Sequence, residues 1–179
     1  VLHRFLFKQQ LYNLDRDVTP IGLVAETPNV IVVNAASPYR DLKSFIDASR
    51  AQPDRLTMTS ADPGTTSEVG VKLFIAQTGA AVRQIPYKAT AAQLSDLLGG
   101  HVDAMMENLP PLIGNLKDGR LRALAVTTKT RAASNPDVPT VAESGFPGYQ
   151  AIGWNGVFVP AGTPAAIVKT LNSAVQSAL

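Results

Sequence analysis

Short apolar runs alternate with segments of helical periodicity along most of this chain, and this alternation constrains its fold more than any other feature. The apolar runs are either continuous or alternate with polar residues, as strands do. They lie at 30–33, 56–59, 82–85, 102–106 and 121–126. Between them, apolar residues recur at helical spacing, most regularly Leu109, Leu112, Ile113 and Leu116. The alternation predicts an α/β fold with a mainly parallel sheet flanked by helices.

Glycine and proline mark the ends of these segments. Gly79, Gly99 and Gly119 follow predicted helices, where a residue with a positive φ angle often ends the helix. Ser37 and Pro38 are typical of an N-cap followed by proline at the first helical position, so a helix is expected from there to just before Pro53.

The composition is that of a globular protein and excludes several classes. The 179 residues are 45% hydrophobic and 17% charged, which argues against disorder, collagen and coiled coil. The longest apolar runs are far shorter than the roughly 18 residues of a membrane span, so no membrane helix is expected. The first residues show no basic stretch followed by an apolar one, so we expect no signal peptide in this sequence.

Charge and side-chain inventory argue against nucleic-acid binding and catalysis. The formal net charge is +2, and lysine and arginine are scattered rather than clustered. With no cysteine and only His3 and His101, thiolate or histidine metal sites are not expected. His101 and Asp103 lie two residues apart on one predicted strand, without an identifiable nucleophile. The sequence therefore predicts no enzyme, no metal and no cofactor.

The polar loop from Ser60 to Ser67 is the best candidate for ligand binding. It joins a predicted strand to a predicted helix, and Gly64, Thr65 and Thr66 lie within it. Free backbone N–H groups at a helix start attract anions, and glycine permits close approach of a ligand to the backbone. The alternative is a capped helix start that binds nothing.

Four further residues are weaker candidates. Tyr87 and Lys88 follow one strand and Asn108 ends another, and ligands of open parallel sheets gather beyond the carboxyl ends of strands. Lys88 could attract an anion and Tyr87 could wall a pocket, or both could be ordinary surface residues. Asn108 could bind a polar ligand or cap the next helix. Trp154 and Asn155 lie between Gly153 and Gly156 on a predicted strand, and Trp154 could stack on a ligand or pack in a core.

An ordered set of motifs resembles one family over nearly the whole chain, from about residue 16. The motifs are Pro28-Asn29-Val30, the Ser60/Gly64-Thr65 loop, Ile85-Pro86-Tyr87-Lys88, Leu97-Leu98-Gly99-Gly100-His101-Val102-Asp103, Asn108-Leu109-Pro110, Gly119-Arg120-Leu121-Arg122-Ala123-Leu124-Ala125-Val126, Pro136-Asp137-Val138-Pro139-Thr140-Val141-Ala142-Glu143 and Pro160-Ala161-Gly162-Thr163-Pro164. Together they resemble the Bug (TctC-type) solute-binding proteins of tripartite tricarboxylate transporters.

The resemblance implies a periplasmic receptor with a type II periplasmic-binding-protein fold. Two α/β lobes would close over a small carboxylate and deliver it to a membrane permease. The sequence departs from the family pattern at Asp62 and Ala89, where glycines are usual, at Glu68, where a histidine is usual, and at Glu107, where an aspartate is usual. Acidic side chains near the loop would oppose an anion. A ligand-sensing effector domain of a transcriptional or signalling regulator, with the same bilobal fold, is the alternative.

The resemblance also suggests a fragment, because the family's N-terminal glycine-rich segment and a tail after Leu179 have no counterpart here. We expect a complete second lobe at 35–148, a first-lobe remnant and crossover at 1–34, and a crossover strand and first-lobe helix at 149–179. Ile167, Leu171 and Val175 would then lack apolar partners, so the fragment is expected to self-associate. It is also expected to bind carboxylates weakly or not at all.

Overall fold

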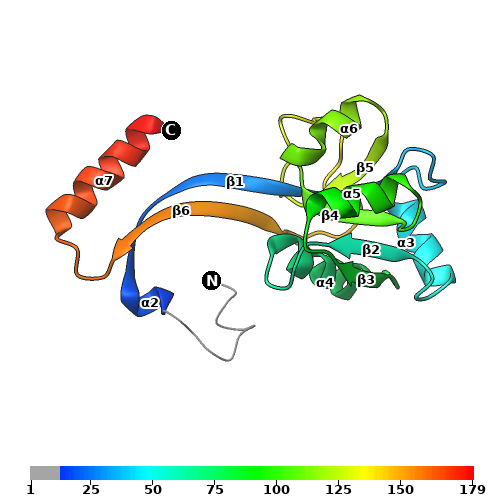
Figure 1. The fold of residues 1–179 in the computed structure, drawn as a ribbon, viewed down its shortest axis with the longest axis horizontal. Helices are drawn as coiled ribbons and strands as arrows, with labels where there is room; N and C mark the ends of the chain where they lie inside the picture. Colours follow the sequence, from blue (N-terminus) through cyan, green and yellow to red (C-terminus); the bar gives the residue numbers. More distant parts are fainter. Residues whose placement is uncertain (1–12) are drawn as a thin grey trace. The chain divides into compact units, whose positions relative to one another are not determined.

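The structure, a computed structural model, describes residues 13–179, which form two compact units (Figure 1). The larger unit is Pro28–Gly153, and the smaller unit comprises 13–27 and Trp154–Leu179. The expected boundaries at 34/35 and 148/149 fall a few residues inside those of the larger unit. The difference arises because the buried strand residues 30–33 belong to the core of the larger unit.

The sheet of the larger unit is mainly parallel, with one antiparallel strand. It is built from β1 (Val18–Asn34), β2 (Thr57–Ser60), β3 (Arg83–Pro86), β4 (Ala104–Asn108) and β5 (Leu121–Val126), in the order β3-β2-β4-β1-β5. Strand β2 runs parallel to β3 and β4, whereas β1 runs antiparallel to β4 and β5. The prediction of an α/β fold with a mainly parallel sheet flanked by helices is confirmed. Strand β1 departs from it, and an apolar run carries no signal of strand direction that could have predicted this.

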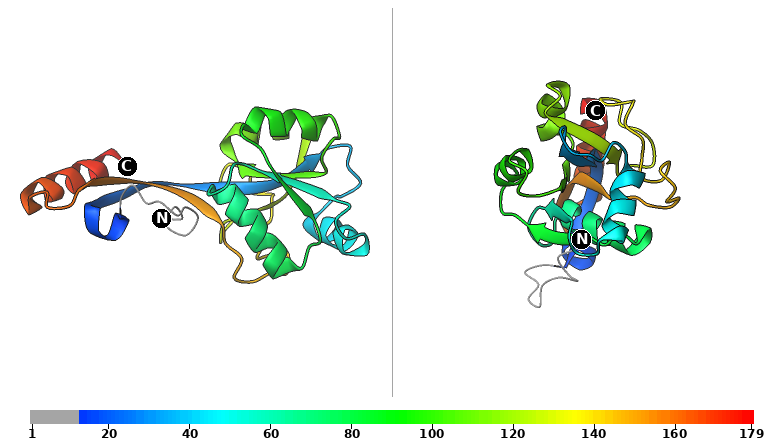
Figure 2. Two further views of the ribbon diagram at one scale, coloured as in Figure 1. Left: turned by 60° about the horizontal axis from the view of Figure 1, so that its bottom comes forward. Right: turned by 90° about the vertical axis from the view of Figure 1, so that its right-hand side faces the viewer.

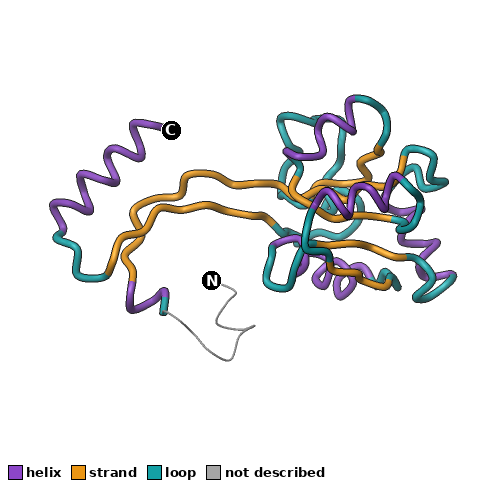
Figure 3. The backbone as a smooth tube through the Cα atoms, viewed as in Figure 1, coloured by secondary structure: helices purple, strands orange, loops and turns teal. Residues whose placement is uncertain are grey.

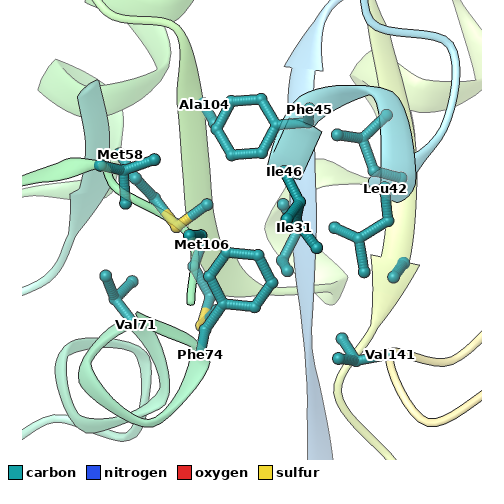
Figure 4. Packing of buried hydrophobic residues seen from close by; sticks show 14 of the residues in the cluster. Ile31, Leu42, Phe45, Ile46, Met58, Val71, Phe74, Ala104, Met106 and Val141 are labelled. Atoms are coloured by element: carbon teal, nitrogen blue, oxygen red, sulfur yellow. The ribbon is translucent and has the colours of Figure 1, made fainter. Parts of the chain in front are cut away.

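Helices cover both faces of this sheet (Figure 2). They are α3 (Leu42–Ala51), α4 (Thr66–Thr78), α5 (Thr90–Leu98), the 3-10 helix η1 (Pro110–Leu112) and α6 (Ile113–Lys117). One core contains Ile31, Phe45 and Phe74 and lies between the sheet and α3 and α4 (Figure 4). The second contains Val32 and Leu97, with α5 on its side of the sheet. Alternate residues of β1 therefore enter different cores, as the two-residue period of a strand requires.

Two helices begin elsewhere than the sequence pattern predicts. Helix α3 begins at Leu42 rather than near Pro38, because Asp41 and Ser44 form a reciprocal capping box. The periodic segment from Leu109 is not one α-helix, since η1 with its two prolines precedes α6. Proline lacks the N–H that an α-helical interior needs, and this accounts for the tighter first turn.

The smaller unit is built from α2 (Leu14–Asp17), the first part of β1, β6 (Ile152–Pro160) and α7 (Ala165–Ala178). Strand β6 pairs with β1, and the two run side by side (Figure 3). Helix α7 has no buried residue, although Ile167 and Leu171 are apolar and at helical spacing. Among residues 13–179, no helix is long and apolar enough to cross a bilayer.

Candidate functional site

Three parallel strands of the larger unit end at the same edge of the sheet. Ser60 at the end of β2 pairs with Pro86 at the end of β3, and β4 reaches the same edge at Asn108. The antiparallel β1 enters the sheet there, with Asn29 opposite Asn108. The 60–67 loop, Tyr87 and Lys88, and Asn108 therefore meet at one edge, which we call the ligand edge.

Helix α4 begins at the ligand edge with two free donors. Thr65 is its N-cap: the Thr65 hydroxyl accepts a hydrogen bond from Glu68 N at 3.2 Å, and Thr65 N donates to Asp62 O at 3.2 Å. The N–H groups of Thr66 and Ser67 donate to no group among the described residues. They are two of the orphan donors at the positive end of a helix dipole, so they can donate hydrogen bonds to an anion.

The hydroxyls of Ser60 and Ser67 shape the loop itself. Ser60 Oγ accepts from Gln84 Nε2 at 2.9 Å and donates to Ala61 O at 3.2 Å. Ser67 Oγ accepts from Ala61 N at 3.1 Å. Both serines are buried. They hold the loop in the conformation that leaves the two N–H groups unpaired.

Gly64 is held by an acidic side chain in the first turn of α4. Its φ of +92° is a conformation that favours glycine, and its N–H donates to Glu68 Oε2 at 3.5 Å. Glu68 is only 4% exposed and forms an ion pair with Lys72, four residues along α4. The Gly64 donor is therefore occupied, and the charge of Glu68 is offset by Lys72.

Two asparagines face each other across β1 and β4. Asn108 does not cap the following helix, since the N-cap of η1 is Leu109, and its side chain has no hydrogen-bond partner among residues 13–179. Asn29 is fully buried; its Nδ2 donates to Ala151 O at 3.3 Å, and its Oδ1 has no partner within the described chain. By strand alternation, both side chains share the face of Ile31 and Met106, which α4 covers.

Asn29 was absent from the set of candidates derived from the sequence. The signal available was an asparagine directly before the apolar run 30–33, a position where a polar side chain at a strand start is unremarkable. Only the antiparallel pairing with β4 places it at the ligand edge.

The remaining candidates differ in what they can offer. The Tyr87 hydroxyl donates to Asp96 on α5, and this hydrogen bond raises the pKa of Tyr87. Lys88 is exposed and has no ion-pair partner among the described residues. Trp154 lies on β6 in the smaller unit, where its ring packs against that of Phe158 with centroids 6.2 Å apart.

Glu107 is bonded away from the free donors, whereas Asp62 of the loop is exposed and forms no ion pair among the described residues. The carboxylate of Glu107, the residue before Asn108, is buried and accepts from Gln93 Nε2 at 3.1 Å and Thr90 Oγ1 at 3.3 Å on α5. No group of three or more possible metal-ligating side chains occurs in the described part of the chain. The available donors at this edge are the unpaired N–H groups, the Asn108 amide and Lys88, and all of them can donate hydrogen bonds to an anion.

Two curated proteins illustrate the similarity in sequence. The "UPF0065 protein in tcbD-tcbE intergenic region" of a Pseudomonas species is 37% identical over 180 residues, which cover 100% of this chain and 54% of that protein. Protein BugT of Bordetella pertussis is 35% identical over 94% of this chain and 52% of its own length. The chain thus spans about half the length of these relatives.

Two solved structures from Rhodopseudomonas palustris share the fold. The structure of Rpa4515 with adipate is 35% identical, with a TM-score of 0.82 over 95% of this chain and 57% of that one. MatC with bound malate is 32% identical, with a TM-score of 0.80 over 98% of this chain and 60% of that one.

A family model described as "Tripartite tricarboxylate transporter family receptor" matches residues 2–179. The match covers almost the whole chain, and the fold and the relatives agree with it. The family is one of solute-binding receptors, not of enzymes. This chain belongs to the TctC family of tripartite tricarboxylate transporter receptors.

Proposed function

We propose that this chain is the ligand-binding part of a periplasmic receptor that captures a small carboxylate and delivers it to a tripartite tricarboxylate transporter. The observation that carries the proposal is the pair of unpaired N–H groups of Thr66 and Ser67 at the ligand edge. Similar proteins solved with adipate and with malate support a carboxylate as the ligand class. The description of similar structures as periplasmic supports the location.

The electrostatics of the ligand edge favour an anion, although Asp62 in the loop is exposed and carries a charge without an ion-pair partner among the described residues. The start of α4 carries a partial positive charge, and a carboxylate there accepts charge-assisted hydrogen bonds. Glu68 is paired with Lys72, and Glu107 is bonded to α5, so neither presents a free charge to the donors. Lys88 and the Asn108 amide supply further donors at the same edge. We propose that the ligand carboxylate binds the two N–H groups and contacts Asn108.

A proline at position 66 tests this arrangement. Proline fits the first position of a helix, and Thr65 already has the extended conformation (φ −79°, ψ 160°) that a residue before proline requires. Thr66→Pro therefore removes one free donor with little change to the fold. Position 65 is unsuitable, because its N–H holds the loop.

The measurement is a titration of the 179-residue chain with adipate and malate, followed by amide chemical shifts. We expect shifts at residues 61–68 and 108, with affinities in the millimolar range. Thr66→Pro should weaken binding about tenfold or more, because a hydrogen bond to a charged group is lost. Thr66→Ala keeps the N–H and should bind as the parent does. Equal affinity of the proline variant and the parent would contradict the proposal.

We also propose that the chain self-associates through α7. Ile167 and Leu171 lie one turn apart on this helix and are 49% and 37% exposed. Apolar side chains in one stripe favour association when no other element covers them. Sedimentation velocity should show a concentration-dependent oligomer that Leu171→Glu reduces to monomer. Thr170→Glu, on the same exposed helix, is the matched control and should leave the oligomer intact. A parent chain that stays monomeric at high concentration would overturn this proposal.

A further inference from the structure

The larger unit contains a cavity at the edge of the sheet opposite the ligand edge. Its volume is about 700 Å³. The segment after β1, the second half of α3, and the residues just before β2 and β4 line it. Pockets that bind small molecules in proteins are typically about 300–1,000 Å³. The cavity therefore has the size of a ligand site, and it is separate from the donors of α4.

Two side chains of opposite charge line this cavity without neutralising each other. Asp103 Oδ2 accepts hydrogen bonds from Thr57 N and Thr57 Oγ1, both at 2.8 Å. Arg55 donates to Gln52 Oε1, and Gln52 also lines the cavity. Within residues 13–179, neither charge has an ion-pair partner. Each side chain is hydrogen-bonded to a neutral neighbour, so no side chain of the described residues neutralises its charge.

Tyr39 also lines the cavity and adds an aromatic ring to it. Its ring packs edge-on against Phe45, with centroids 5.3 Å apart and planes at 82°. Burial raises the pKa of the Tyr39 hydroxyl; the Asp103 charge raises it further and the Arg55 charge lowers it. Both charges therefore act on the same hydroxyl, which itself has no hydrogen-bond partner in the described chain.

We propose that this cavity is a second binding site, for a small zwitterion of the amino-acid type. The ligand carboxylate would pair with the Arg55 guanidinium and the ligand ammonium with the Asp103 carboxylate, beside the Tyr39 ring. A guanidinium binds a carboxylate with matched geometry, and an ammonium donates to a carboxylate. A ligand with one charge would leave the opposite protein charge unpaired, so both charges on one molecule are required. Because Arg55 lies on the exposed rim, we expect millimolar affinity.

The experiment titrates the ¹⁵N-labelled chain with glycine, β-alanine and γ-aminobutyrate, which differ in the distance between their charges. Acetate and methylammonium, each carrying one of the two charges, are the control probes. We expect saturable amide shifts at residues 36–39, 52–56 and 100–103 for at least one zwitterion. The single-charge probes should bind at least about tenfold more weakly.

Two variants separate a binding role from a structural one. Asp103→Asn keeps an oxygen that can accept from Thr57 N but removes the charge, and Arg55→Gln removes the other charge. Each should weaken zwitterion binding about tenfold, whereas Arg83→Gln, an exposed arginine outside the cavity, should not. Shifts confined to residues 61–68 and 108 would place the zwitterion at the ligand edge and overturn the proposal. Absence of saturable shifts with all three zwitterions, or unchanged binding by both cavity variants, would also overturn it.

Discussion

Both compact units contain large hydrophobic side chains, but the larger unit buries them and the smaller unit leaves most of them exposed. In the larger unit, Phe45 and Phe74 are fully buried between the sheet and its helices. Among the described residues of the smaller unit, Ile21 is the one buried hydrophobic residue, while Trp154 and Leu171 are 44% and 37% exposed. All exposed large hydrophobic residues among 13–179 belong to the smaller unit. An apolar helix stripe thus stabilises a fold only when another element covers it.

The largest expected difference in unfolding free energy is between truncation of a buried aromatic residue and truncation of an exposed leucine. Phe45→Ala should lower the free energy of unfolding by about 3–5 kcal/mol, because it removes a fully buried ring and leaves a cavity. Leu171→Ala, on the exposed face of α7, should change it by less than about 0.5 kcal/mol. Urea unfolding followed by circular dichroism at low protein concentration measures both. Similar losses for the two variants would mean that Leu171 is covered in solution.

Replacing a glycine by alanine in each unit compares how tightly the two units are packed. A Cβ at Gly70 in α4 would lie 2.8 Å from the sulfur of the buried Met106 and 3.3 Å from Ala151 Cβ. Alanine usually stabilises a helix relative to glycine, but this clash reverses the sign, and Gly70→Ala should cost about 1–3 kcal/mol.

The control for Gly70 is Gly22 in the smaller unit. A Cβ there would lie 3.3 Å from Val175 Cγ1 on α7. Because α7 has no buried residue, the helix can shift to make room. Gly22→Ala should change the unfolding free energy by less than about 0.5 kcal/mol. A Gly70→Ala protein as stable as its parent in thermal unfolding would show that the α4 contact has room.

The smallest effect is expected at an exposed carboxylate of the larger unit. Glu143 accepts from Thr140 N at 2.7 Å and pairs with Arg131 at 3.0 Å, and these contacts lower its pKa below the ordinary 4.5. A lowered pKa means that the stabilisation is present above pH 4.5 and is lost as the pH falls through the lowered value. Glu143→Gln should lower the melting temperature slightly at pH 7, and the difference should disappear in acid.

Glu26→Gln provides the comparison for this effect in the smaller unit. Glu26 is exposed and forms no ion pair among the described residues, so its substitution should leave the melting temperature unchanged from pH 7 into acid. A Glu143→Gln difference that persists unchanged below pH 3 would show that the carboxylate charge is not its cause.

Most elements of the larger unit follow from local patterns. Strands β2, β4 and β5 lie where alternating or continuous apolar runs predict them, and α4 ends at Gly79, whose φ is +64°. These signals are local, because burial of a strand or a helix face repeats with the period of that element. The start of α3 was mispredicted, since the Ser37–Pro38 pattern and the Asp41–Ser44 capping box compete within a few residues.

The ligand edge is only partly readable from the sequence. Glycine, serine and threonine between a strand and a helix predict a polar loop with free donors, and Thr66 and Ser67 retain them. Which donors stay free depends on contacts that the pattern does not contain: the Glu68 carboxylate occupies Gly64 N, and Tyr87 is turned to Asp96. Both contacts depend on which partner a flexible side chain reaches in the folded structure.

The sequence by itself determined the α/β class, the order of the strands and helices along the chain and the loop that opens α4, because hydrophobic periodicity and turn residues act over a few neighbouring residues. Tertiary structure decided the antiparallel direction of β1, the meeting of Asn29 with Asn108, and the cavity that Arg55 and Asp103 share. These features join residues that are tens of positions apart, and their geometry arises only when the strands pair and the helices pack on them.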